Sequence, residues 1–123
     1  MTKQEMKART KQYALRVIRA AQSLPNDRVA NVLGSQVLRA GTSVGANYRA
    51  ACRAKSTADF VNKLKIVEEE GDESLFWMEL LVESGITTQQ KLGALMKEGD
   101  EIVSIVVAAL KTTRLSRLVN RNS

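Results

Sequence analysis

The chain has 123 residues, of which 44% are hydrophobic and 26% charged, and its formal net charge is +6. This length and composition predict a single packed domain over residues 1–123 rather than a disordered chain. The sequence contains no histidine, which excludes histidine-based metal sites and the Ser-His-Asp and Cys-His classes of catalysis.

The first half of the sequence predicts two helices, over residues 3–23 and 27–53. Pro25 separates them, since proline cannot continue a helix and disfavours helical geometry at the residue before it. Asn26 or Asp27 then offers a side-chain oxygen to cap the second helix. Apolar residues recur at helical spacing in both segments. In the second helix this stripe comprises Val29, Leu33, Val37, Ala40, Val44, Tyr48 and Ala51.

The second half predicts two more helices, over residues 57–84 and 88–117. Ser56 and Asp59 have the spacing of a capping box, and Thr87 and Gln90 repeat it. Gly85 stands where a left-handed residue closes a helix. Short loops make consecutive helices antiparallel neighbours, so the expected fold class is all-α, an antiparallel up-down-up-down four-helix bundle. The apolar stripe of the third helix comprises Phe60, Leu64, Val67, Gly71, Leu75, Met78 and Val82.

Some apolar residues remain after one stripe per helix is assigned to the core. They lie off the main stripe of the third helix and within residues 102–110, a segment that is apolar nearly all round. A large apolar patch on a single bundle marks an interface, whereas the alternative is one wide core stripe with scattered apolar residues at the surface. We expect a homo-oligomer, with an interface that includes Ile66, Phe76, Trp77, Leu80, Ile105 and Val107.

Charge is strongly segregated along the chain. Residues 1–55 carry a net charge of +9, residues 56–101 a net charge of −7, and residues 102–123 a net charge of +4. The basic ends either contact nucleic-acid phosphates or pair with the acidic third helix, within or between subunits. Base-reading motifs are not recognisable, so binding would be to backbone phosphates. The candidate nucleic-acid contacts are Lys3, Lys7, Arg9, Lys11, Arg16, Arg19, Arg114, Arg117 and Arg121.

The second helix combines small residues with a polar ridge. Gly41, Gly45 and neighbouring alanines lower helix propensity, which is usual where another backbone approaches closely. Antiparallel register places Arg39 about level with the acidic sequence EEEGDE over residues 68–73. Because a guanidinium and carboxylates would fix the helix register, we expect a structural polar network. Its members are Arg39, Ser43, Asn47, Glu70 and Glu73.

The sequence offers no pair of a nucleophile and a base, so we expect no catalytic, cofactor-binding or metal-binding residues. Cys52 is expected to pack as a structural residue, and a lone cysteine suits a reducing compartment. Residues 1–20 lack the apolar run of a signal peptide, and residues 102–110 are too few to span a bilayer. These features predict a cytoplasmic protein that does not associate with membranes.

Two segments carry a family resemblance: RAGTSVGANYRA over residues 39–50 and DESLFWMELL over residues 72–81. They resemble a bacterial family of four-helix-bundle proteins that includes proteins encoded in intervening sequences of 23S ribosomal RNA genes. The resemblance implies a barrel-like homopentamer without established enzymatic activity. It extends to the accessory protein of diversity-generating retroelements, which partners a reverse transcriptase and binds nucleic acid. The chain departs from many members at Tyr48-Arg49-Ala50, where they carry Ala-Glu-Gly, and this makes its second helix more basic.

These features favour a non-catalytic oligomeric accessory module that binds nucleic acid through its basic surfaces. RNA is the favoured ligand. The alternative is an oligomeric protein–protein interaction scaffold. The expected partners are therefore further copies of the chain, RNA or DNA, or another protein.

Overall fold

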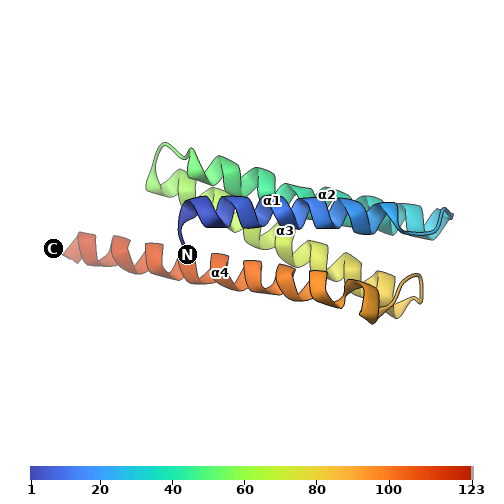
Figure 1. Cartoon of the computed structure of the whole chain (residues 1–123). Helices are drawn as coiled ribbons and strands as arrows, with labels where there is room; N and C mark the ends of the chain where they lie inside the picture. Colours follow the sequence, from blue (N-terminus) through green and yellow to red (C-terminus); the bar gives the residue numbers. More distant parts are fainter. Residues whose placement is uncertain (123) are drawn as a thin grey trace.

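The chain folds into four α-helices (Figure 1). The computed structural model describes the backbone of residues 1–122 and the side chains of residues 1–116, and this part of the chain contains no strand. The helices are α1 (Lys3–Gln22), α2 (Arg28–Cys52), α3 (Thr57–Glu83) and α4 (Gln89–Asn122). The all-α fold is thus confirmed. The bounds lie within one residue of the predicted ones, except that α4 continues past residue 117 to residue 122.

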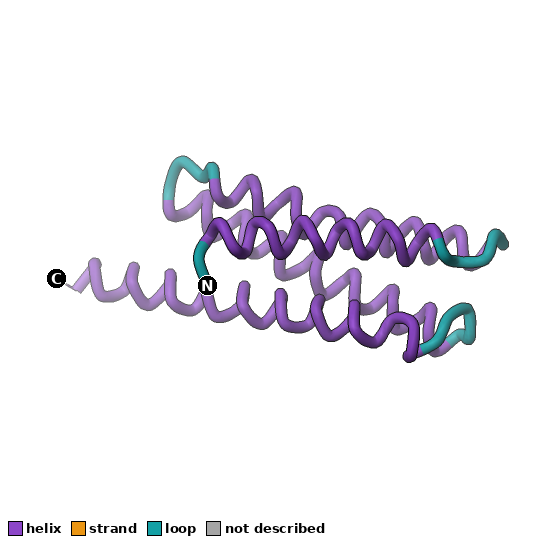
Figure 2. Tube along the Cα trace, in the orientation of Figure 1, coloured by secondary structure: helices purple, strands orange, loops and turns teal. Residues whose placement is uncertain are grey.

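The helices surround one core, and each packs against its neighbours in sequence. The loops that follow α1 and α3 lie at one end of the molecule, and the loop between α2 and α3 lies at the other (Figure 2). Helix α1 also contacts α4, although less extensively than it contacts α2. The C-terminal end of α4 projects beyond the other three helices (Figure 1).

Local capping determines where the helices begin and end. Asp27 and Ser56, both expected as caps, accept backbone N–H groups three residues on, at 2.9 and 3.1 Å. The capping box expected at Thr87 is wrong by one residue, because the side chain of Thr88 accepts the equivalent N–H at 3.2 Å. Gly85 closes α3 with a φ of +83°, as expected for a left-handed terminal residue.

The core is aliphatic apart from tyrosines, and its position on two helices differs from the expected one. Val29 is 55% exposed, because the buried stripe of α2 begins one residue later, at Ala30. On α3, the buried face runs through Val61, Leu64, Val67, Gly71, Ser74, Met78 and Leu81. The expected Phe60, Leu75 and Val82 lie beside this face and are only partly buried. Helix α3 carries apolar residues on adjacent ridges, so periodicity alone does not fix which ridge faces inward.

Helices α1 and α2 approach each other closely at two glycines of α2. A Cβ atom on Gly41 would lie 2.7 Å from the side chain of Val17, and one on Gly45 would lie 3.2 Å from the backbone oxygen of Thr10. The close approach expected at these small residues is therefore present. It brings basic side chains of the two helices to either side of one narrow seam.

Candidate nucleic-acid interface

A small groove lies over the seam between α1 and α2, with a volume of about 220 Å³. Three basic side chains line it: Lys7 and Lys11 from α1, and Arg49 from α2. Its remaining lining residues are small and uncharged: Ala14, Thr42, Gly45 and Ala46. The groove thus presents positive charge above a surface that lets a ligand approach the backbone closely.

The arrangement follows from helix geometry. Lys7 and Lys11 are one helical turn apart on α1 and so share a face, while the turn of α2 that carries Arg49 lies beside them. Within residues 1–116, none of these three side chains forms a salt bridge. Lysine and arginine are donors to anionic oxygens, so the groove can hold phosphate groups of a polyanion.

Arg49 was not among the expected contacts. The departure from the family at Tyr48-Arg49-Ala50 had indicated a more basic second helix, but it did not indicate which face of the helix Arg49 would occupy. That placement depends on the rotation and register of α2 against α1, which Gly41 and Gly45 set through their contacts.

Arg9 takes part in a contact between helices rather than lining the groove. Its guanidinium donates to both carboxylate oxygens of Glu98 at 2.7 Å, and to Glu101 at 2.6 Å. The side chains of Arg9 and Glu98 are only 23% and 19% exposed, so this pair is partly shielded from water. The pair joins α1 to α4, and because its charge is neutralised, Arg9 is poorly suited to the expected role in binding a polyanion.

These hydrogen bonds lower the pKa of Glu98 below its usual value near 4.5. Partial burial opposes the effect, and the charges of Arg9 and Arg16 add to it. A carboxyl group whose pKa is lowered by folding stabilises the protein above its unfolded-state pKa, and this contribution is lost as the pH falls through the folded-state pKa.

The Glu98→Gln variant is therefore expected to be less stable than the wild type at pH 7, by about 1–2 kcal/mol. The difference should shrink as the pH falls from 4.5 towards the lowered pKa of Glu98, because the wild type then loses the same ion pair. Urea unfolding at pH 7 and at pH 3 measures both quantities. Glu79→Gln, at an exposed carboxylate on α3, is the control and should change the stability little. If Glu98→Gln lost the same unfolding free energy at both pH values, the ion pair with Arg9 would not be the source of the lost stability.

The other expected cations are spread over the surface. Lys3 lies over the ring of Phe60, with its Nζ atom 4.7 Å from the ring centroid. Arg16 is half-buried on α1, and Arg19 and Arg114 are exposed on α1 and α4. The side chains of Arg117 and Arg121 lie outside the described residues. Among the expected cations within residues 1–116, the structure therefore brings only Lys7 and Lys11 together in a groove.

The polar network expected around Arg39 divides into two parts. Arg39 donates to Glu70 at 3.1 Å and also to Glu73, linking α2 to α3. Asn47 instead donates to Ser43 at 2.8 Å within α2. Because the side chain of Arg39 is 48% exposed, its ion pairs contribute at most about 1 kcal/mol to stability.

The expected interface residues differ in how much surface they present. Phe76 is 49% exposed and packs edge-on against Trp77, with ring centroids 5.1 Å apart. The other five are half-buried, and two of them, Trp77 and Ile105, pack against the core. Further exposed apolar residues, which periodicity did not single out as surface residues, include Leu15, Val29, Val32, Leu38 and Leu115.

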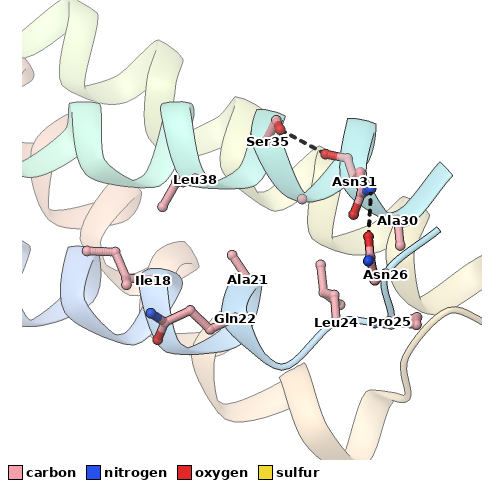
Figure 3. Close-up of a pocket in the computed structure, with 11 residues that line it drawn as sticks. Ile18, Ala21, Gln22, Leu24, Pro25, Asn26, Ala30, Asn31, Ser35 and Leu38 are labelled. Carbon is pink, nitrogen blue, oxygen red and sulfur yellow. Dashed lines mark hydrogen bonds between the residues drawn. The ribbon is translucent and has the colours of Figure 1, made fainter. Parts of the chain in front are cut away.

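A larger hollow, of about 420 Å³, lies beside the loop between α1 and α2 (Figure 3). Asn31 donates to the side chain of Asn26 at 3.1 Å, and Ser35 donates to the backbone oxygen of Asn31 at 2.8 Å (Figure 3). None of the residues that line this hollow is charged. It therefore offers no counterpart to a phosphate, unlike the groove between Lys7 and Arg49.

Two further features concern metals and membranes. Among the side chains that the structure describes, no three of the acidic or cysteine type converge to form a possible metal site. In the same part of the chain, none of the helices combines the length and apolar character needed to cross a bilayer.

Known proteins place this chain in a family. The sequence signature of the 23S rRNA-intervening sequence proteins matches residues 2–108. The chain is also similar to a crystal structure of a protein of unknown function from the S23 ribosomal protein family of Bacteroides thetaiotaomicron VPI-5482. The two are 34% identical with a TM-score of 0.81, over 86% of this chain and 98% of the other. No curated protein matches. The extent of the signature match establishes that the chain belongs to the 23S rRNA-intervening sequence protein family.

Proposed function

We propose that the protein is a non-catalytic, cytoplasmic accessory module that binds RNA along the seam between α1 and α2. The groove lined by Lys7, Lys11 and Arg49 carries this proposal, because three cations without described ion-pair partners converge there. Phosphate contacts of this kind give affinity without base specificity. The small residues beneath the cations support the proposal, since they leave room for a nucleic-acid backbone.

The module is proposed to act as a homo-oligomer of antiparallel up-down-up-down bundles, with a pentamer implied by the family resemblance. Exposed apolar side chains on α2 and α3, such as Val32 and Phe76, support self-association. An oligomer would repeat the basic groove around its axis, so that one RNA could contact several copies at once. Such multivalent contact raises affinity without requiring a larger site on each chain.

The test is the salt dependence of RNA binding. The variant with Lys7→Gln, Lys11→Gln and Arg49→Gln is compared with the wild type by titration of a single-stranded RNA at several salt concentrations. The logarithm of the RNA association constant falls linearly with the logarithm of the salt concentration, and each phosphate contact with a single strand adds about 0.7 to the steepness of this fall. The slope should therefore fall by roughly 2 for each bound copy, and the affinity at low salt should fall with it.

A matched control removes the same charge from other surfaces. Lys65, Lys91 and Lys97 are exposed on α3 and α4, and their triple replacement by Gln also lowers the net charge by three. This control should leave the slope nearly unchanged. If both triple variants lost the same RNA affinity and salt slope, only the net charge of the protein would matter. If the variant at Lys7, Lys11 and Arg49 kept the wild-type slope, the proposed groove would be refuted.

The second candidate function is an oligomeric scaffold for another protein. The exposed Phe76 favours it, because this aromatic ring lies on α3 among Asp72, Glu73 and Glu79, away from the basic seam. A scaffold would give light-scattering evidence of an oligomer that does not retain RNA at any salt concentration.

A further inference from the structure

A further cavity, of about 330 Å³, lies near the start of α1. It lies between residues of all four helices, and most of its lining is apolar. The residues that form this lining include Met6, Tyr48, Phe60, Leu64, Ile105 and Ala109. Its volume is at the lower end of the range for ligand pockets, roughly 300–1,000 Å³.

A polar groove of about 570 Å³ adjoins this cavity and shares four lining residues with it: Lys3, Phe60, Thr112 and Thr113. Lys3 and Lys55 both line the groove, and no acidic residue does. The contact of Lys3 with the Phe60 ring, at 4.7 Å, holds its ammonium group where the groove meets the cavity.

The cavity offers few hydrogen bonds to a ligand. The hydroxyls of Thr112 and Thr113 donate to backbone oxygens of their own helix, at 3.0 and 2.8 Å, and so present only lone pairs. These two oxygens and the hydroxyl of Tyr48 could pair with only some of the polar groups of a nucleobase or sugar. Each remaining polar group would be buried at a cost of about 1–3 kcal/mol. An alkyl chain has no such groups and gains from leaving water.

We propose that this end of the bundle binds a single-chain anionic amphiphile, such as a medium-chain carboxylate. The alkyl chain occupies the apolar cavity, and the anionic head lies in the groove between Lys3 and Lys55. The cavity volume suits one chain rather than the two chains of a bilayer lipid, so the ligand is a free amphiphile and not a membrane surface. The site shares no residue with the proposed RNA groove.

Calorimetric titration of the full chain with decanoate, below its micelle-forming concentration, tests the proposal. One decanoate should bind per chain. Octanoate should bind about 15-fold more weakly, since each buried methylene changes affinity about fourfold. The variant with Lys3→Gln and Lys55→Gln should bind decanoate about tenfold more weakly. The control with Lys91→Gln and Lys97→Gln, which removes the same charge from α4 at a distance from this site in the sequence, should bind decanoate like the wild type.

The single cysteine gives an independent readout, because Cys52 lines the polar groove. Decanoate at ten times its Kd should slow alkylation of Cys52 by iodoacetamide about tenfold, since only the unliganded fraction reacts. Failure of decanoate to bind would overturn the proposal, as would equal weakening in the two lysine variants. Binding to phosphatidylglycerol vesicles without binding of free decanoate would also overturn it, in favour of a membrane lipid.

Discussion

The Tyr13→Ala variant is expected to lose about 3–5 kcal/mol of unfolding free energy, the range for removing a buried aromatic side chain. Tyr13 is 1% exposed and reaches across the core from α1. Its hydroxyl lies 2.8 Å from Oγ of Ser74 on α3, and its ring abuts Gly99 on α4, where an added Cβ would lie 2.6 Å from the hydroxyl oxygen. One side chain thus connects three helices. Urea unfolding measures the loss.

The contribution of the Tyr13 hydroxyl to stability can be measured separately from that of its ring. Oγ of Ser74 donates to the backbone oxygen of Gly71 at 2.7 Å, so the Tyr13 hydroxyl must donate to Ser74. Tyr13→Phe leaves the Ser74 donor satisfied and should cost only about 1 kcal/mol, whereas Ser74→Ala leaves the buried Tyr13 donor without a partner and should cost about 1–3 kcal/mol.

The double variant with Tyr13→Phe and Ser74→Ala should cost less than the sum of the single variants, because it removes both partners. Burial raises the pKa of Tyr13 to about 12, which fits a hydroxyl that stays neutral and donating at neutral pH. If Tyr13→Phe proved more costly than Ser74→Ala, the assigned direction of this hydrogen bond would be wrong.

Local signals in the sequence predicted the helices well. Ser56 and Asp27 act through hydrogen bonds to residues three positions away, and Gly85 through its own backbone angle, so each signal is contained in a short segment. The shift from Thr87 to Thr88 shows the limit of such signals, because two adjacent threonines offer equivalent caps. The glycines of α2 also indicated a close approach, since their effect on helix propensity requires compensation by packing.

Contacts between distant residues could not be predicted in the same way. Arg9 pairs with Glu98 across 89 residues of sequence, and nothing near Arg9 distinguishes it from Lys7 or Lys11 as a residue with a carboxylate partner. Arg49 joins the basic groove only because of the rotation of α2. Both assignments depend on how whole helices are rotated and aligned, which is set by the summed packing of many side chains rather than by any one motif.

Replacing Gly41 with alanine is expected to destabilise the protein, although alanine favours helices by about 1 kcal/mol. The new Cβ would lie 2.7 and 2.8 Å from the two methyl groups of Val17 and 3.1 Å from its Cβ. Val17 is fully buried and β-branched, so rotating its side chain cannot relieve all three contacts. Overpacking of this kind costs about 1–3 kcal/mol, because side chains or whole helices must shift to make room. This cost outweighs the gain in helix propensity, so the free energy of unfolding should fall.

Gly93→Ala provides the matched control, because the same substitution in α4 meets only the flexible side chain of Gln89, at 3.2 Å. It should stabilise the protein by about 0.5–1 kcal/mol, so the unfolding free energies of the two variants, measured in urea, should differ by roughly the overpacking cost of about 1–3 kcal/mol. The double variant with Val17→Ala and Gly41→Ala should cost less than the sum of the single variants, since Val17→Ala removes the methyl groups that clash. Strictly additive effects of Val17→Ala and Gly41→Ala would mean that the seam between α1 and α2 adjusts freely. The basic side chains above that seam would then have no fixed spacing, and the groove between Lys11 and Arg49 would lose its structural basis.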